Sequence, residues 1–375
     1  MRFHRLISLA LLALLLVGVT AWLLRTQRAT ATRHDQLATT SQPPGRAAHS
    51  FHRLPRLATD AEQPATEASE APPETATNFL QRLLAENATM SEAACAQIAP
   101  WLARNRTNAE SLLAVRQAGG GQEYLLTALT NFPHDPRVLF GALALNDSAE
   151  AQRERFDRFK AAAPENALVD YLSARDHLKH GRPAEALSDL TAAAQKSHFQ
   201  EYLLDAMQNC EEFHLAAGKS PLEAKALACS TALLPHLAQL KGLAGDLATL
   251  QRQYLAAGDA ASAENLALYG LQLSQHLTAG EGSRTLIGQL VGVATAQIVL
   301  NPLNSEPYRN QLQGTVQDRL ASLTAQKAAF RQDWKTAEQW LETASEADLG
   351  NYFERQKLYG EAGAIAWAKQ RPAGQ

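Results

Sequence analysis

Cysteine is scarce in this sequence and widely spaced. The 375 residues include three cysteines, Cys95, Cys210 and Cys229, whereas a disulfide framework or a zinc site needs close pairs. An excess of positive charge is also lacking, because 35 Lys and Arg residues stand against 38 Asp and Glu residues, for a formal net charge of -3. A nucleic-acid partner would need a basic patch that neutralises phosphates. We therefore expect no nucleic acid, no metal and no cofactor, and a stability that depends on packing.

No complete phosphate-binding signature is present either. Ala217-Gly218-Lys219-Ser220 resembles the end of a phosphate-binding loop, but Phe213 stands where the first glycine is required. An amphipathic helical pattern precedes this stretch in place of the required strand. We interpret Ser220 to Glu223 as a capping box, with Pro221 at the first helical position.

Two further motifs have a simpler structural interpretation. Glu110-Ser111 resembles the catalytic pair of helical-superhelix lytic transglycosylases, but the Gly-Leu-Met-Gln run of that family is missing downstream. His177 and His180 could share a helix face, yet only Asp176 lies nearby as a third metal ligand. Histidines near a helix C-terminus also interact with its exposed carbonyls. We assign no catalytic residue and expect a protein that is not an enzyme.

An uncharged apolar run extends from Leu6 to Leu24, after a basic leader at residues 1–5. A helix of this length, at about 1.5 Å per residue, just spans a hydrocarbon core of about 30 Å. We predict a transmembrane signal anchor, bounded by Trp22 and Arg25, with the bulk of the chain outside the cytoplasm, on the periplasmic side if the cell is bacterial. The alternative is a secretory signal cleaved near Ala21. Both interpretations export the body of the protein.

Residues 25–77 are rich in Pro, Ala, Thr, Ser and Gln and contain few large apolar side chains. A segment of this composition buries too little apolar surface to offset its loss of conformational entropy. We predict a disordered linker with a root-mean-square reach of roughly 40 Å.

Residues 78–375 show a helical pattern throughout, because apolar residues recur at intervals of three and four and no alternating β-branched run is long enough for a strand. The predicted fold class is all-α. Small and apolar residues follow two glycines at equal offsets: Ala186, Leu190 and Ala193 after Gly181, and Ala263, Ala267 and Gly270 after Gly258. A third copy carries Ala337, Leu341 and Ala344, with Gln332 in place of the glycine.

These offsets resemble the tetratricopeptide repeat family, whose helix-turn-helix unit of about 34 residues has glycine at the turn. The best match is the stretch from Gly181 to Leu187, and the best units are 167–200, 244–277 and 318–351. The resemblance implies paired helices stacked into an α-solenoid. Gln251 departs from it, because Ala174 supplies a small side chain at the matching position. The alternative is an unrelated all-α bundle.

Cys210 and Cys229 are nearly equidistant from the turn at residues 218–220. An antiparallel helix pair would place them at one level along its axis, where a disulfide is geometrically feasible. Export to an oxidising compartment would allow that disulfide. The alternative is two buried thiols, and Cys95 stays unpaired in both cases.

Aromatic residues concentrate near the carboxyl end: Trp334, Trp340, Tyr352, Phe353, Tyr359 and Trp367. We expect them to pack as the cap of the helical stack, and the alternative is a partner-binding or dimerising surface.

The sequence therefore favours a membrane-tethered, non-enzymatic scaffold for protein–protein interaction in the cell envelope, held in the membrane through residues 6–24, with a protein or peptide partner that the sequence does not identify. One alternative is an exported helical enzyme such as a cell-wall glycosidase. Another is a structural envelope protein that self-associates as a homo-oligomer.

Overall fold

A computed structural model describes residues 76–87, 90–145, 147–232, 234–304 and 315–371. The chain divides into two units, residues 1–70 and 71–375, and all the described residues belong to the second. Within them the regular structure is helical, without a named strand, apart from one isolated bridge between Asn166 and His198. The prediction of an all-α protein is therefore confirmed for this part of the chain. The predicted anchor at 6–24, the cleavage site near Ala21 and the predicted linker as far as residue 75 lie outside the described residues. The last two residues of the predicted linker, 76 and 77, are the first residues of a helix, so the helical region begins two residues earlier than expected.

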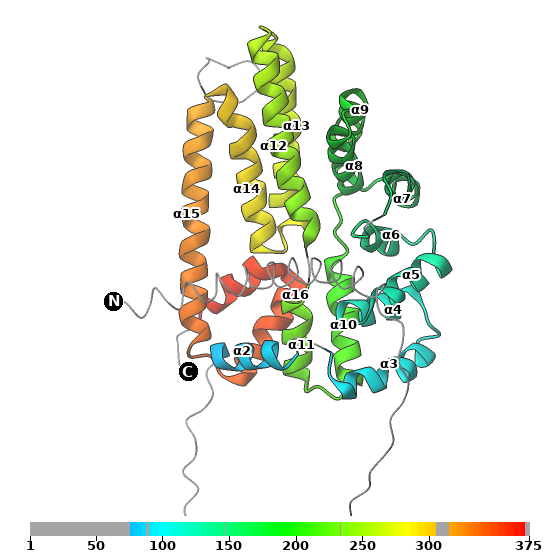
Figure 1. Ribbon diagram of the computed structural model, residues 1–375. Helices are drawn as coiled ribbons and strands as arrows, with labels where there is room; N and C mark the ends of the chain where they lie inside the picture. The colour runs from blue at the N-terminus through cyan, green and yellow to red at the C-terminus, as the bar shows by residue number, and fades with distance from the viewer. Residues whose placement is uncertain (1–75, 88–89, 146, 233, 305–314, 372–375) are drawn as a thin grey trace, which may run out of the picture. The chain divides into compact units, whose positions relative to one another are not determined.

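The helices, labelled as in Figure 1, follow one another through short connections. Their bounds are α2 (Ala76–Glu86), α3 (Glu92–Arg104), α4 (Ala109–Gln117), α5 (Gln122–Asn131), α6 (Pro136–Ala142), α7 (Ala149–Ala162), α8 (Ala167–Lys179), α9 (Pro183–Ala194), α10 (Leu203–Ala216), α11 (Pro221–Ser230), α12 (Pro235–Ala256), α13 (Ala260–Thr278), α14 (Leu286–Leu300), α15 (Val316–Leu341) and α16 (Glu346–Ala368), with 3-10 turns at η1 (Gly280–Ser283) and η2 (Asn301–Leu303).

Local sequence chemistry sets many of these helix starts. Side chains of Ser, Thr, Asn or Asp accept a hydrogen bond from a backbone amide of the first turn at α3, α4, α6, α7, α8, α11, α13, α14, α15 and α16. Such caps satisfy amides that have no partner inside the helix. Proline occupies the start of α6, α9, α11 and α12, where its missing amide hydrogen is no loss.

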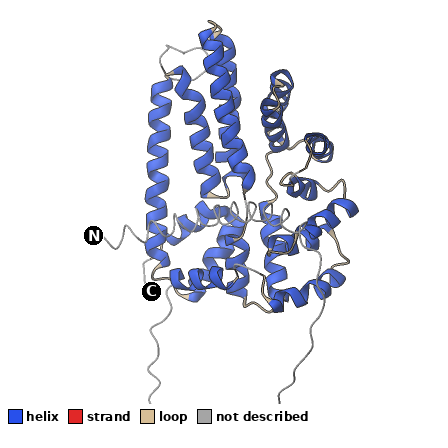
Figure 2. Ribbon diagram, in the orientation of Figure 1, coloured by secondary structure: helices blue, strands red, loops and turns tan. Residues whose placement is uncertain are grey.

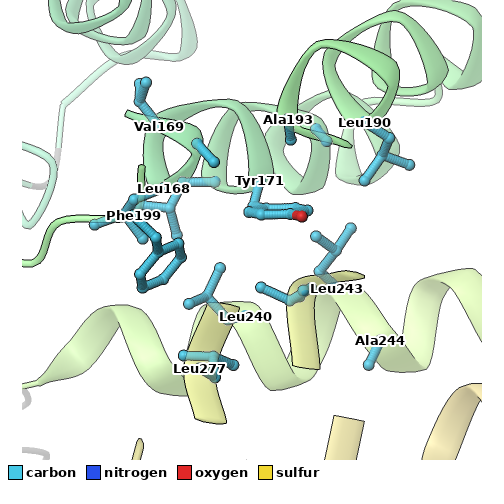
Figure 3. Packing of buried hydrophobic residues seen from close by; sticks show 14 of the residues in the cluster. Leu168, Val169, Tyr171, Leu190, Ala193, Phe199, Leu240, Leu243, Ala244 and Leu277 are labelled. Carbon is cyan, nitrogen blue, oxygen red and sulfur yellow. The ribbon is translucent and has the colours of Figure 1, made fainter. Parts of the chain in front are cut away.

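Neighbouring helices from α3 to α9 pack against one another in chain order. The α8/α9 hairpin also packs on the α12/α13 hairpin, α8 against α12 and α9 against α13, whereas α10 packs on α3, α4 and α16. Helices α12 to α15 lie side by side (Figures 1 and 2). Figure 3 shows Leu240 and Leu243 of α12 reaching toward Tyr171 of α8, at the centre of the largest hydrophobic cluster.

Each of the first two predicted repeat units contains a helix hairpin: 167–200 contains α8 and α9, and 244–277 contains nearly all of α13 and the later part of α12, a helix that begins at Pro235. Gly181 ends α8 with φ +68°, and Gly258 ends α12 with φ +80°, a backbone region that favours glycine. The small residues after each turn are buried as expected. At Gly270 a Cβ would lie 2.5 Å from Val299 Cγ1, so the glycine allows α13 and α14 to approach closely.

The third predicted unit, 318–351, lacks the expected turn at Gln332. Helix α15 runs unbroken from Val316 to Leu341, and the connection to α16 follows it at residues 342–345. The repeat offsets alone suggested a break there, but Gln332 does not favour the positive φ that ends α8 and α12. The caps at Thr315 and Ser345 mark the real helix starts.

Gln251, the predicted departure from the repeat pattern, is fully buried in α12. Its Nε2 donates to the carbonyls of Ala263 (3.1 Å) and Val299 (3.0 Å). A long polar side chain at this position therefore joins three neighbouring helices, α12, α13 and α14.

The carboxyl-terminal aromatic residues belong mainly to a core. Trp340, Tyr352 and Phe353 are buried, in one cluster with Phe79 of α2. Trp367 lies edge to face with Trp340. By contrast, Tyr359 is 68% exposed.

Within the described part of the chain, one helical stretch, Leu286–Leu303, is long and apolar enough to cross a membrane by length and composition. It comprises α14 and η2, and 61% of it is buried. Because α12, α13 and α15 all pack against α14, we interpret its apolar character as that of a core helix.

Candidate functional site

The most unusual backbone feature is a break inside α16, at Gly360. This residue has φ +78° and ψ 169°, which divides the helix into two parts. A Cβ at this position would lie 2.7 Å from the carbonyl oxygen of Arg284. Both the positive φ and this close approach require glycine. We call residues 284–287 and 357–361 the α14–α16 joint.

Reciprocal hydrogen bonds hold the two sides of the joint together. The amide of Glu361 donates to the carbonyl of Arg284 (2.6 Å), and Glu361 Oε2 accepts from the amide of Leu286 (2.8 Å), the first residue of α14. Arg284 Nη1 donates to the carbonyls of Lys357 (3.3 Å) and Leu358 (3.1 Å). An acid thus caps the start of one helix and a base caps the end of another, and both contacts complement the helix dipoles.

Burial raises the pKa of the Glu361 carboxyl above its ordinary value, although the hydrogen bond from the Leu286 amide lowers it. The carboxyl is enclosed within the joint, so we assign it the role of positioning the two helices.

Exposed apolar side chains gather in the chain segments that form this joint. Ile287 is 43% exposed, Leu358 47% and Tyr359 68%. The other large hydrophobic side chains exposed to this degree in the described residues are Leu126 and Leu215. Exposed apolar groups on a rigid backbone can bind a partner by removing their surface from water.

A second feature is a polar cluster formed by α7, α8, α9 and the connection after α9. We call it the α7–α9 cluster, and its members are Arg153, Lys160, Asp170, Ser173, Asp176, His177, Asp189 and Lys196. Arg153 Nη2 donates to Ser173 Oγ (2.6 Å), and Arg153 Nη1 lies 2.9 Å from His177 Nε2. Ser173 and Lys160 both donate to the carboxylate of Asp189. Cations from α7 thus meet carboxylates from α8 and α9.

His177 and His180 do not share a site. His177 faces Arg153, whereas Nδ1 of His180 lies 2.8 Å from the carbonyl oxygen of Asp176, near the end of α8. The described residues contain no group of three or more His, Cys, Asp or Glu side chains suited to a metal ion. The interpretation of His180 as a partner of helix-end carbonyls is confirmed.

Cys210 and Cys229 lie on α10 and α11, which pack together as an antiparallel pair would, but both thiols are free. Cys210 Sγ lies 4.0 Å from Thr231 Oγ1, and Cys229 Sγ donates to the carbonyl of Phe353 at 3.7 Å. Burial raises the pKa of each thiol to about 12. The structure therefore has the alternative arrangement of two buried thiols.

The remaining motifs have structural roles. Ser220 and Glu223 form the predicted capping box at the start of α11. Glu110 pairs with Arg137 at 2.7 Å, and Ser111 Oγ donates to the carbonyl of Asn108. Both side chains of the Glu110-Ser111 pair therefore have structural partners.

The sequence interpretation missed the α14–α16 joint. One local signal was available, because an isolated glycine in a helical pattern favours a break. Its partner Arg284 lies more than seventy residues earlier in the chain, and no local pattern connects the two.

No protein-family model, curated protein or solved structure matches this chain.

Proposed function

We propose that this chain is a membrane-tethered, non-enzymatic protein that binds another protein through the α14–α16 joint. The observation that carries the proposal is the exposure of Ile287, Leu358 and Tyr359 on segments joined by reciprocal helix caps. Surface hydrophobic residues scattered singly are ordinary, whereas a group of them is typical of an interaction site.

A rigid joint favours binding because little conformational freedom remains to be lost. Gly360 and Glu361 hold the end of the first part of α16 against the start of α14. A tyrosine with two side-chain torsions is a good anchor for an interface, since it offers a large contact area at low entropic cost. The expected partner presents an apolar pocket that receives Tyr359.

The membrane tether is the second part of the proposal. Its support is the apolar run at 6–24, followed by a linker composition at 25–77 that favours disorder. Amino-terminal sequencing of the mature protein tests it, because a chain that begins shortly after Ala21 would replace an anchored protein with a secreted one.

The stacking of helix hairpins supports a third element, an α-solenoid similar to tetratricopeptide repeats. The α8/α9 and α12/α13 hairpins pack on each other helix by helix, as successive repeats do. The unbroken α15 excludes the third unit, and α10 and α11 pack on α2, α3, α4 and α16 instead of between the two hairpins, so the resemblance is limited to α8/α9 and α12/α13.

Photo-crosslinking in the native membrane tests the interaction proposal. A photoreactive amino acid is placed at position 358 or 359 of the full chain, and the adducts are separated by mass. Leu126 on α5 is the matched control, because it is 46% exposed against 47% for Leu358. We expect one shared adduct from positions 358 and 359 that position 126 does not form.

Two outcomes would contradict this proposal. Equal labelling from all three positions would mean that the joint is ordinary surface. An adduct made only with a second copy of the chain would support the self-associating alternative instead.

A further inference from the structure

Arg153 is the side chain that ties the first half of α7 to α8. Its guanidinium contacts Ser173 and His177, lies 3.5 Å from the carboxylate of Asp176, and covers the ring of Phe156 at 4.9 Å. Ser173 is fully buried and His177 is 9% exposed. These contacts are therefore largely shielded from solvent, and their stability depends on which atoms donate and which accept hydrogen bonds.

The contact between Arg153 and His177 is compatible with only one protonation state of the imidazole. A guanidinium nitrogen can only donate, so Nε2 of His177 accepts and the ring is neutral, with its hydrogen on Nδ1. This Nδ1 is buried without a partner. A proton added at Nε2 would place two donors and two positive charges 2.9 Å apart.

We propose that His177 is a proton-operated latch: protonation of its Nε2 displaces the Arg153 guanidinium, and the first half of α7 separates from α8. No bond is broken in this step beyond hydrogen bonds, and the proton comes from the solvent.

Charged groups from the surrounding segments lie near His177, and their combined effect favours displacement of Arg153 once Nε2 is protonated. Those that act on His177 itself are Arg153 and Lys160 on α7, Arg182 before α9, and Asp189 on α9. Asp157 and Asp176 pair instead with Arg153, and Asp176 also pairs with Arg182.

Burial lowers the pKa of His177, and the positive charges of Arg153, Arg182 and Lys160 add to the effect, while Asp189 opposes it. Asp189 Oδ2 lies 3.5 Å from Nε2 and is the acceptor to which a protonated ring would turn.

Without its contact to α8, the first half of α7 loses tertiary support, so its backbone hydrogen bonds open more often while α7 stays attached to α6. Gln152 donates to the carbonyl of Leu143 at 3.3 Å, and Arg155 donates to that of Ala142 at 3.4 Å. These contacts hold α7 to α6. The side chain exposed by the movement is Phe156, which is 2% exposed in the closed arrangement. The latch would thus expose an apolar surface in acid.

Hydrogen exchange followed by mass spectrometry on the full chain tests the latch. Exchange of the amides from 153 to 158 is compared at pH 7.5 and pH 5.5, after correction for the intrinsic pH dependence. One proton taken up by the open form, with a pKa near 6.5, increases the opening constant by about tenfold over this interval. We therefore expect about tenfold faster exchange of α7 in the wild type.

Three variants make the result specific. His177→Gln keeps an acceptor for Arg153 and cannot titrate, so α7 should stay protected at both pH values. Arg153→Gln removes the tie, and exchange should be fast at both. His214→Gln removes a buried histidine elsewhere and should leave the α7 response unchanged.

The proposal is overturned if exchange of the α7 amides in the wild type is no faster at pH 5.5 than at pH 7.5, a result that depends on no variant. It is also overturned if His177→Gln accelerates as the wild type does, while its α10 amides remain protected.

Discussion

His214 should make the stability of the α10 region depend on acid. This histidine is 6% exposed in the last turn of α10, and its Nε2 is buried without a partner. Desolvation lowers its pKa from 6.5 to about 4, and the positive charge of Lys219 adds to the effect. The unfolded chain therefore binds a proton more readily than the folded one.

The pH window follows from these two values. Above pH 6.5 the imidazole is neutral in both states and the full stability is present. As the pH falls through 6.5 toward 4, the unfolded state gains a proton first, and stability is lost. At about 1.4 kcal/mol for each unit of pKa difference, the loss is about 3 kcal/mol at pH 4.

Buried carboxyls would partly mask this loss in the wild type. Burial raises the pKa of Glu361 and of Asp170, so these groups take up protons in the folded state and add stability as the pH falls. A comparison with a variant that cannot titrate at position 214 isolates the histidine.

Urea unfolding of the full chain and of His214→Leu, at pH 7.5 and pH 4.5, provides this comparison. Tryptophan fluorescence is a suitable signal, because Trp101 packs edge to face on Phe213 at 5.8 Å, next to His214. The wild type should lose roughly 2 to 3 kcal/mol more than the variant over this range. Parallel losses, within about 0.5 kcal/mol, would refute the reasoning.

Two further substitutions test the packing. In chemical denaturation, Gly360→Ala should destabilise the protein by at least about 2 kcal/mol, since it adds a strained positive φ to a close contact with backbone. Gly350→Ala, with open space in the same helix, should instead stabilise it by about 0.5 to 1 kcal/mol. Equal effects of the two substitutions would contradict the role of the joint. Lys357→Met breaks a buried 2.7 Å pair with Glu211 and should cost about 3 to 5 kcal/mol. The double variant with Glu211→Leu should recover most of that loss in thermal unfolding, and no recovery would argue against an unpaired buried charge as the cause.

Helix content and several boundaries could be predicted because their causes are local. The turns at Gly181 and Gly258 need positive φ, and the capping box at Ser220 and Glu223 lies within a single turn of helix. Each of these signals is complete within a few residues, so one sequence contains all the information it requires.

The unbroken α15 shows where a repeat frame misleads. Equal offsets of small residues fit a close helix pair, and they fit one face of a long helix equally well. The feature that distinguishes the two is the absence of glycine at position 332, because a hairpin of the predicted kind needs a residue that tolerates positive φ.

Both candidate sites were unpredictable for the same reason. Glu361 caps a helix that starts at Leu286, and His177 accepts from Arg153 on the preceding helix. A carboxylate or an imidazole is recognisable in a sequence, but its partner is set by tertiary packing. The sequence left two arrangements open for Cys210 and Cys229 for the same reason: helix pairing brings α10 and α11 together, but the neighbour that each sulfur contacts is set by tertiary packing.

The latch and the joint lie on different helices, α7 and α8 for the latch and α14 and α16 for the joint. Helices α4 to α7 pack in sequence, with α4 against α10 at one end and α7 against α8 at the other. A proton at His177 weakens the second contact, whereas the joint at Gly360 receives no charge from that step. The two proposals therefore separate experimentally: acid should change exchange in α7 without changing the crosslinks from Tyr359. If acid accelerated exchange in α7 and also abolished the crosslinks from position 359, the helices between α8 and α16 would respond as one cooperative unit.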